Sequence, residues 1–154
     1  MLPVQHIHPI LVHFPIVFFL TLAVLDAVSA ARGATVTGRG ALGSVSSGLA
    51  LLSGGFAVIA YLFGGMALDV AESTGFHSDI AETHEGLGGI TAAAFGAWAL
   101  IRIFMWWRDY RLGRTGSALL SLVEIAGAGL VVATAYYGGR MVYELGVNVA
   151  PVMH

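Results

Sequence analysis

Two histidines that lie within apolar stretches are the residues of this sequence best suited to chemistry. His13 belongs to the segment HPILVHFPI (residues 8–16), and His84 follows the segment SDIAET (residues 78–83). A neutral imidazole can ligate a metal ion or move a proton near neutral pH. Ionisable side chains inside a membrane-spanning segment are costly and usually serve a function. The two histidines are therefore candidates for a metal or cofactor site.

Both histidines are expected at a similar depth in their helices. Pro9 suits the first position of a helix, which places His13 about 6 Å into the span at 1.5 Å per residue. Ser78 is an acceptable N-cap, which places His84 about 9 Å into another span by the same rise. Two imidazoles on facing helices of a four-helix bundle form the axial ligand pair of a b-type haem. We therefore expect His13 and His84 to ligate the iron of one haem b.

Three further histidines are expected nearer the water interface. His8 precedes Pro9 and should therefore be extended, and His6 alternates with it. His77 lies seven residues before His84, on the same face if the helix continues. None of the three should ligate the haem. They are instead alternative ligands of a surface zinc or copper ion, because imidazole suits both metals. Purely structural histidines are the remaining interpretation.

Small residues and one arginine surround the expected site. Gly86 follows His84, and Gly139 lies at the end of the last apolar stretch. Such residues leave room for a flat macrocycle, although close helix packing also uses them. Arg140 should hold the haem propionates, since arginine binds carboxylates bidentately. Alternatively, Arg140 stabilises the C-terminal end of its helix.

The composition is that of a membrane protein. Of the 154 residues, 57% are hydrophobic and only 10% are charged, whereas about 25% are charged in a typical soluble domain. The mean hydropathy is +0.83. The chain contains no cysteine, which excludes disulfides, iron–sulfur clusters and thiolate metal sites. The net charge of −2 argues against a nucleic-acid partner.

Four apolar stretches are long enough to cross a bilayer, whose core needs roughly 20 helical residues. They cover about residues 9–31, 42–68, 80–107 and 117–137. Short polar loops join them, so the sequence predicts an all-α, integral membrane, four-helix antiparallel bundle in a single domain. The segments FGGMALD (63–69) and YGGRMVYE (137–144) resemble each other, which hints at an internal duplication.

The arginines predict the orientation in the membrane. Six of the seven basic residues lie in or near the first and third loops, and only Arg140 lies on the other side. Because basic residues favour the cytoplasmic side, both termini should be periplasmic. All six histidines, His154 included, then lie toward the periplasm. We expect a multi-pass protein of the bacterial inner (plasma) membrane.

Three charged residues lie in the inner part of the expected bundle. Asp26, Arg102 and Glu124 should face the interior and pair with one another, because unpaired charges are expensive there. A structural cluster is the preferred interpretation. A proton path to a quinone is the alternative.

Three segments resemble a family of bacterial four-helix membrane proteins catalogued as a domain of unknown function (number 2231). The first is HPILVHFPI, and the second is the end of the second span, with Gly64 near Asp69. The third is GGRMVYELGVNV (138–149). The resemblance implies the four-span fold and carries no activity with it.

These observations predict an electron-transfer protein similar to b-type cytochromes, with one haem near the periplasmic side. It would be an electron carrier or subunit rather than a stand-alone enzyme. Besides the lipid bilayer, its partners would be quinol, a periplasmic cytochrome c or other membrane subunits. The alternatives are a histidine-rich metal-binding or transport-related protein, or a structural subunit of a larger complex.

Overall fold

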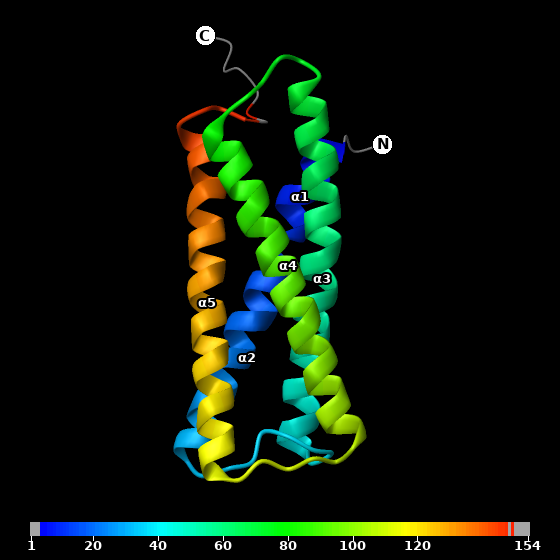
Figure 1. Cartoon of the computed structure of the whole chain (residues 1–154), viewed down its shortest axis with the longest axis vertical. Coiled ribbons are helices and arrows are strands. Elements are labelled where there is room, and N and C mark those ends of the chain that lie inside the picture. Colours follow the sequence, from blue (N-terminus) through cyan, green and yellow to red (C-terminus); the bar gives the residue numbers. More distant parts are fainter. Residues whose placement is uncertain (1–3, 148, 150–154) are drawn as a thin grey trace.

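The protein is a bundle of long helices in the computed structural model, which describes residues 4–147 and 149 (Figure 1). The helices are α1 (Val4–Leu11), α2 (His13–Ala31), α3 (Ala41–Glu72), α4 (Asp79–Trp107) and α5 (Arg114–Tyr143). Helices α1 and α2 together make one span, His6–Ala31, and the described part of the chain contains four spans long and apolar enough to cross a membrane. The expected all-α membrane bundle is confirmed.

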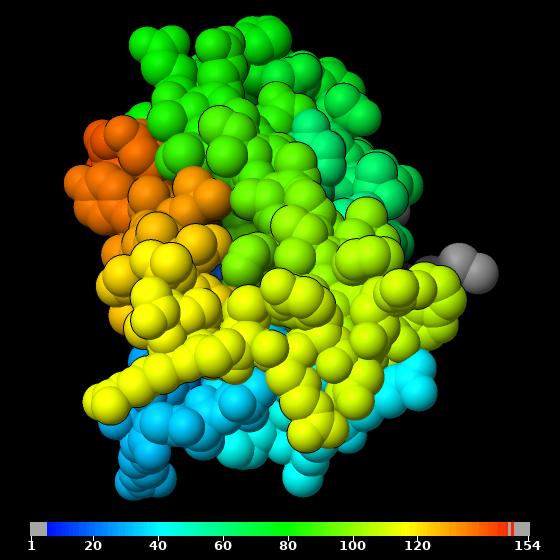
Figure 2. Space-filling view, turned by 60° about the horizontal axis from the view of Figure 1, so that its bottom comes forward, coloured from blue at the N-terminus to red at the C-terminus, as the bar shows by residue number. Residues whose placement is uncertain are grey.

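The two ends of the bundle differ in character. At one end lie loops 32–40 and 108–113, which we call the arginine end because Arg32, Arg39, Arg108 and Arg111 belong to them. At the other end lie loop 73–78, the start of α1 and the end of α5, which we call the histidine end (Figure 1). Figure 2 turns the arginine end toward the reader, where loop 108–113 and the start of α5 (yellow-green to yellow) lie beside the first loop (blue to cyan).

Hydrogen bonds join the two loops of the arginine end. The backbone N–H of Arg39 donates to Asp109 Oδ1 at 2.7 Å. The backbone N–H of Leu112 donates to Thr37 Oγ1 at 2.9 Å. The two helical hairpins are therefore fastened to each other at this end.

The first span begins earlier than the sequence indicated. Helix α1 includes His8 and Pro9, so the expected extended backbone at His8 and the expected start at Pro9 are wrong. Proline is tolerated in membrane helices, where neighbouring groups satisfy the freed backbone atoms. Packing of His8 against α3 outweighs the local preference of a residue before proline. The helix is interrupted at Val12, within one turn of Pro15, which offers no N–H to the carbonyl four residues earlier.

The two halves of the chain are built alike. Asp26 and Arg102 are 76 positions apart, and two other contacting pairs have the same separation. The three pairs are His8 with His84, Phe19 with Phe95, and Asp26 with Arg102. Each pair joins α1 or α2 to α4 across the bundle. The hairpin α1–α3 is therefore related to the hairpin α4–α5 by an approximate two-fold axis, an arrangement also known from membrane proteins built of parallel repeats. The likeness of the two Gly–Gly segments belongs to this repeat.

An aromatic pair occupies the middle of the bundle. The rings of Phe19 and Phe95 stack with centroids 3.7 Å apart, and both side chains are buried. A β-carbon at Gly127 would lie 2.5 Å from the Phe19 ring, so only glycine fits beside it. Phe19 lies between His8 and Asp26 in the sequence. Phe95 likewise lies between His84 and Arg102. The stacked pair therefore separates the histidines from the inner charged residues.

Candidate functional site

The rings of His8 and His84 lie close together near the histidine end. Their centroids are 6.2 Å apart and their planes are inclined by 76°. His8 Nδ1 is 2.8 Å from the carbonyl oxygen of Ala60, and His84 Nδ1 is 3.0 Å from that of Thr134. Because a carbonyl oxygen only accepts, Nδ1 donates in both bonds, and Nε2 of the neutral ring keeps its lone pair. The same kind of bond orients histidines that ligate metals.

A glycine lies against each of the two rings. A β-carbon at Gly64 would be 2.9 Å from Cε1 of His8, and one at Gly138 would be 2.9 Å from Cε1 of His84. Each glycine follows the accepting carbonyl by four residues, which is about one helical turn. One turn of α3 thus supplies His8 with both a hydrogen-bond acceptor and a glycine that leaves room for the ring. The equivalent turn of α5 does the same for His84. We call the carbonyl and the glycine that hold each imidazole ring its histidine seat. The repeated Gly–Gly segments were the signal in the sequence for these two seats.

The two histidines border a cavity of about 480 Å³ between the hairpins. This volume lies within the usual range of small-molecule and cofactor sites. Equivalent residues of the two halves line it, and most of them are apolar. They include Val12 and Gly88, Ala57 and Val131, Gly65 and Gly139, and Leu68 and Val142. Phe95 also lines the cavity, and its stacking on Phe19 closes the side that faces the charged residues.

The structure brings His8, and not His13, against His84. His13 borders the cavity, but its side chain is exposed on the bundle. The expected pairing of His13 with His84 assumed a helix that starts at Pro9, and the earlier start moves His8 to the level of His84. Sequence reasoning could have found His8 through the repeat, because His8 and not His13 is the counterpart of His84.

The other expected site residues divide into one that borders the cavity and two that do not. Gly139 lines it. Gly86 is exposed and has no neighbour that a β-carbon would meet. Arg140 lies in a separate surface hollow, where its Nε and Nη2 donate to the Glu144 carboxylate at 2.8 and 2.9 Å. The arginine lowers the pKa of Glu144. This pairing agrees with the alternative role of Arg140 at the helix end.

The other histidines that the structure describes form no common site. His6 and His77 are exposed, whereas His8 is held inside the bundle. Within the described residues, no group of three or more His, Cys, Asp or Glu side chains could hold a metal ion. The structure therefore does not bring His6, His8 and His77 together as one group of three ligands. His154 lies outside the described residues.

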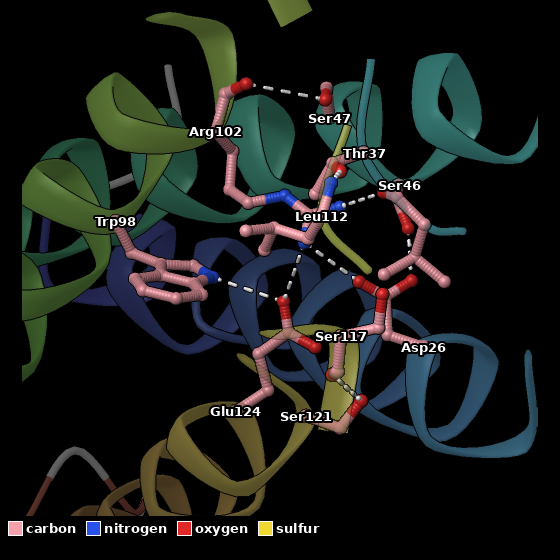
Figure 3. Close-up of polar contacts among 11 residues, drawn as sticks. Asp26, Thr37, Ser46, Ser47, Trp98, Arg102, Leu112, Ser117, Ser121 and Glu124 are labelled. Carbon is pink, nitrogen blue, oxygen red and sulfur yellow. Dashed lines mark hydrogen bonds and ion pairs between the residues drawn. The ribbon is translucent and has the colours of Figure 1, made fainter. Parts of the chain in front are cut away.

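The expected cluster of inner charges is confirmed (Figure 3). One Arg102 nitrogen, Nη1, is 2.9 Å from Asp26 Oδ2 and 3.4 Å from Glu124 Oε1. Its Nη2 donates to the carbonyl oxygen of Val36 at 2.8 Å. The indole N–H of Trp98 donates to Glu124 Oε1 at 3.1 Å. All three charged side chains are fully buried, and they tie α2, α4 and α5 together.

Comparison with known proteins gives one match. The model of the family described as predicted membrane protein (DUF2231) matches residues 5–151. No curated protein and no solved structure matches the chain. The match covers all four spans, both histidine seats and the inner charged cluster. The chain therefore belongs to the DUF2231 family of predicted membrane proteins.

Proposed function

We propose that this protein is a membrane electron-transfer protein that holds one haem b between His8 and His84. One observation carries the proposal: two imidazoles from equivalent positions meet beside an apolar cavity, each fixed through Nδ1 to a backbone carbonyl. Membrane four-helix bundles build haem sites from histidines on facing helices in this way. The ligand pair proposed here replaces the pair His13 and His84.

The spacing of the two rings supports a shared metal. Two imidazoles that share one metal ion would have ring centroids about 6 Å apart, since each metal–nitrogen bond would be about 2.0–2.1 Å. The centroids of His8 and His84 are 6.2 Å apart. A tetrahedral zinc ion needs at least three protein ligands, and the described residues contain no such group. A haem would need only two ligands from the protein, and His8 and His84 would supply them.

The residues around the cavity would set the properties of the cofactor, which supplies one-electron chemistry when bound. The carbonyls of Ala60 and Thr134 hold the imidazoles in one orientation and increase their basicity. Apolar side chains such as Val131 and Phe95 line the cavity and would keep the surroundings of the cofactor apolar. Low polarity around a haem is one of the factors through which a protein sets its reduction potential.

The arginine asymmetry supports a location near the outer surface of the bacterial inner membrane. Arginine-rich loops favour the cytoplasm, so the histidine end and both termini face the periplasm in this proposal. The cavity then lies on the side where quinol or a periplasmic cytochrome c exchanges electrons. Other membrane subunits would contact the lipid-facing surface of the bundle.

An optical experiment on the purified full chain tests the proposal. Protein made in cells supplied with a haem precursor should show a low-spin b-type spectrum that changes on reduction, with one haem per chain. His8→Ala and His84→Ala should each lose this spectrum. His13→Ala is the matched control from the same span and should keep it. A colourless wild-type protein, or full haem content in both His8→Ala and His84→Ala, would contradict the proposal. One copper or zinc ion per chain without haem would favour the metal-binding alternative.

A further inference from the structure

The inner charged cluster contains two carboxyl groups but only one positively charged group to balance them. Asp26 and Glu124 are two carboxyl groups beside the one guanidinium of Arg102, and all three are fully buried. Among the described residues, the other groups that hydrogen-bond to the three charged side chains are neutral: the Ser46 hydroxyl, the carbonyl of Val36 and the Trp98 indole. Burial strongly disfavours an uncompensated charge. One of the two carboxyl groups therefore holds a proton.

The two-fold repeat identifies Glu124 as the additional acid. Asp26 and Arg102 are counterparts, and together they form a complete ion pair across the axis. Ala60 on α3 and Thr134 on α5 are counterparts in the repeat, and the same difference in residue number makes Ala50 the counterpart of Glu124. Ala50 is buried and apolar. The first half of the chain thus has no acid at this position, and the Asp26–Arg102 pair does not need Glu124 for charge balance.

The hydrogen bonds place the proton on the same residue. Both oxygens of Asp26 accept hydrogen bonds, one from the Ser46 hydroxyl and one from Arg102. Glu124 Oε1 accepts from Trp98 and, at the longer distance of 3.4 Å, from Arg102. Glu124 Oε2 is buried and has no partner within the described structure. The carboxyl group whose charge is least stabilised is therefore that of Glu124.

A buried hydroxyl lies on the same face of α5. Ser117 is only 1% exposed, and its Oγ has no partner among the described residues. It precedes Glu124 by seven residues, which is about two turns, and long side chains on a helix lean toward its N-terminus. In Figure 3 the Glu124 oxygen without a dashed line lies in the direction of Ser117. The N-terminus of α5 is also its connection to the arginine end.

We propose that the cluster of Asp26, Arg102 and Glu124 is a proton-binding site, in which Glu124 carries the proton and Ser117 connects it to water at the arginine end. Glu124 Oε2 and Ser117 Oγ both lack a partner among the described residues, and a water molecule between them would carry the proton from one to the other. When the proton leaves through this hydroxyl, the Glu124 carboxylate remains beside Arg102, and the same route returns a proton from water. The site needs no cofactor, so it stands or falls separately from the haem.

Infrared spectroscopy of the full chain in lipid at neutral pH tests the site directly. We expect a carbonyl band of a protonated carboxyl group that shifts in D₂O. The band should move again when glutamate is labelled with ¹³C and stay in place when aspartate is labelled. Glu124→Gln should lose the band, and Glu82→Gln, which changes an exposed acid, should keep it. A missing band, or a band that moves with labelled aspartate, would overturn the proposal. The isotope labelling shows whether a glutamate or an aspartate carries the proton even if a variant fails to fold.

The rate of exchange with D₂O tests the connection. Ser117→Ala should keep the band but slow its deuterium shift several-fold, because the buried hydroxyl on the route from Glu124 to the arginine end is gone. Ser73→Ala, which changes an exposed serine at the histidine end, should exchange like the wild type. An unchanged exchange rate in Ser117→Ala would show that the proton leaves by another route and would overturn the role of this serine.

Discussion

His8 and His84 occupy equivalent seats in the two halves of the bundle. Each Nδ1 faces a backbone carbonyl of the following long helix, at 2.8 Å for His8 and 3.0 Å for His84. Each ring also lies against a glycine one turn beyond that carbonyl. The relationship places a pair of matched imidazoles at the approximate two-fold axis. Loss of either seat should therefore have a similar effect.

We expect Gly64→Ala and Gly138→Ala each to destabilise the protein. The new β-carbon would lie 2.9 Å from an imidazole carbon, so the ring must shift away from the carbonyl that holds it, and such overpacking costs about 1–3 kcal/mol. Gly65→Ala and Gly139→Ala are matched controls from the next positions, where a β-carbon would meet nothing within 4 Å. Thermal unfolding in detergent measures the difference. Equal midpoints for the two seat variants and the two controls would contradict the described packing of the rings.

The two acids of the inner cluster should differ sharply in their contribution to stability. Asp26→Asn leaves Arg102 fully buried without its nearer carboxylate, which lies 2.9 Å away, and breaking a buried pair costs about 3–5 kcal/mol. Glu124→Gln keeps the shape and neutral charge of a protonated acid and should cost no more than about 1 kcal/mol, the net worth of an ordinary hydrogen bond. Denaturant unfolding of both variants measures this. A larger loss for Glu124→Gln than for Asp26→Asn would reverse the assignment.

The stability of the arginine end should depend on acid pH through Asp109. The hydrogen bond from the Arg39 backbone N–H, together with Arg111, lowers the pKa of the Asp109 carboxyl group below its ordinary value. A carboxyl group with a lowered pKa in the folded state stabilises the protein above its unfolded pKa, about 3.9 for Asp, and loses this contribution as the pH falls through the folded pKa. Asp109→Asn should thus unfold at a lower temperature than the wild type at neutral pH.

The difference between Asp109→Asn and the wild type should then shrink as the pH falls below the ordinary range of aspartate. Melting curves of both proteins across that range provide the measurement. A difference that stays constant down to strongly acidic pH would show that the carboxylate charge contributes nothing to the junction between the two loops.

Reporter fusions should place the two ends of the bundle on opposite sides of the membrane. A reporter enzyme that is active only outside the cytoplasm should work when inserted at Gly75, in the loop of the histidine end. The same reporter inserted at Gly33, in the loop of the arginine end, should be inactive. The physical reason is the cytoplasmic preference of arginine-rich loops. Activity at Gly33 and inactivity at Gly75 would invert the proposed orientation.

The sequence by itself determined the four spans, the positions of the loops and the pairing of the inner charges. Span length and hydropathy follow from the thickness of the bilayer, which acts on each segment separately. The pairing of Asp26, Arg102 and Glu124 follows from the cost of an unpaired charge, which holds for any packing of these helices. Such features depend on the environment of a segment and need no knowledge of its neighbours.

The tertiary structure alone decided which histidine faces His84. His8 and His13 are five residues apart, and five residues at 3.6 per turn place them on different faces of a helix. The local rule for a residue before proline indicated an extended His8, whereas the carbonyl of Ala60 and the bare surface of Gly64 hold it in the helix. The direction of a side chain depends on where its helix starts and on what the neighbouring helix offers. Both become defined only when the two hairpins pack.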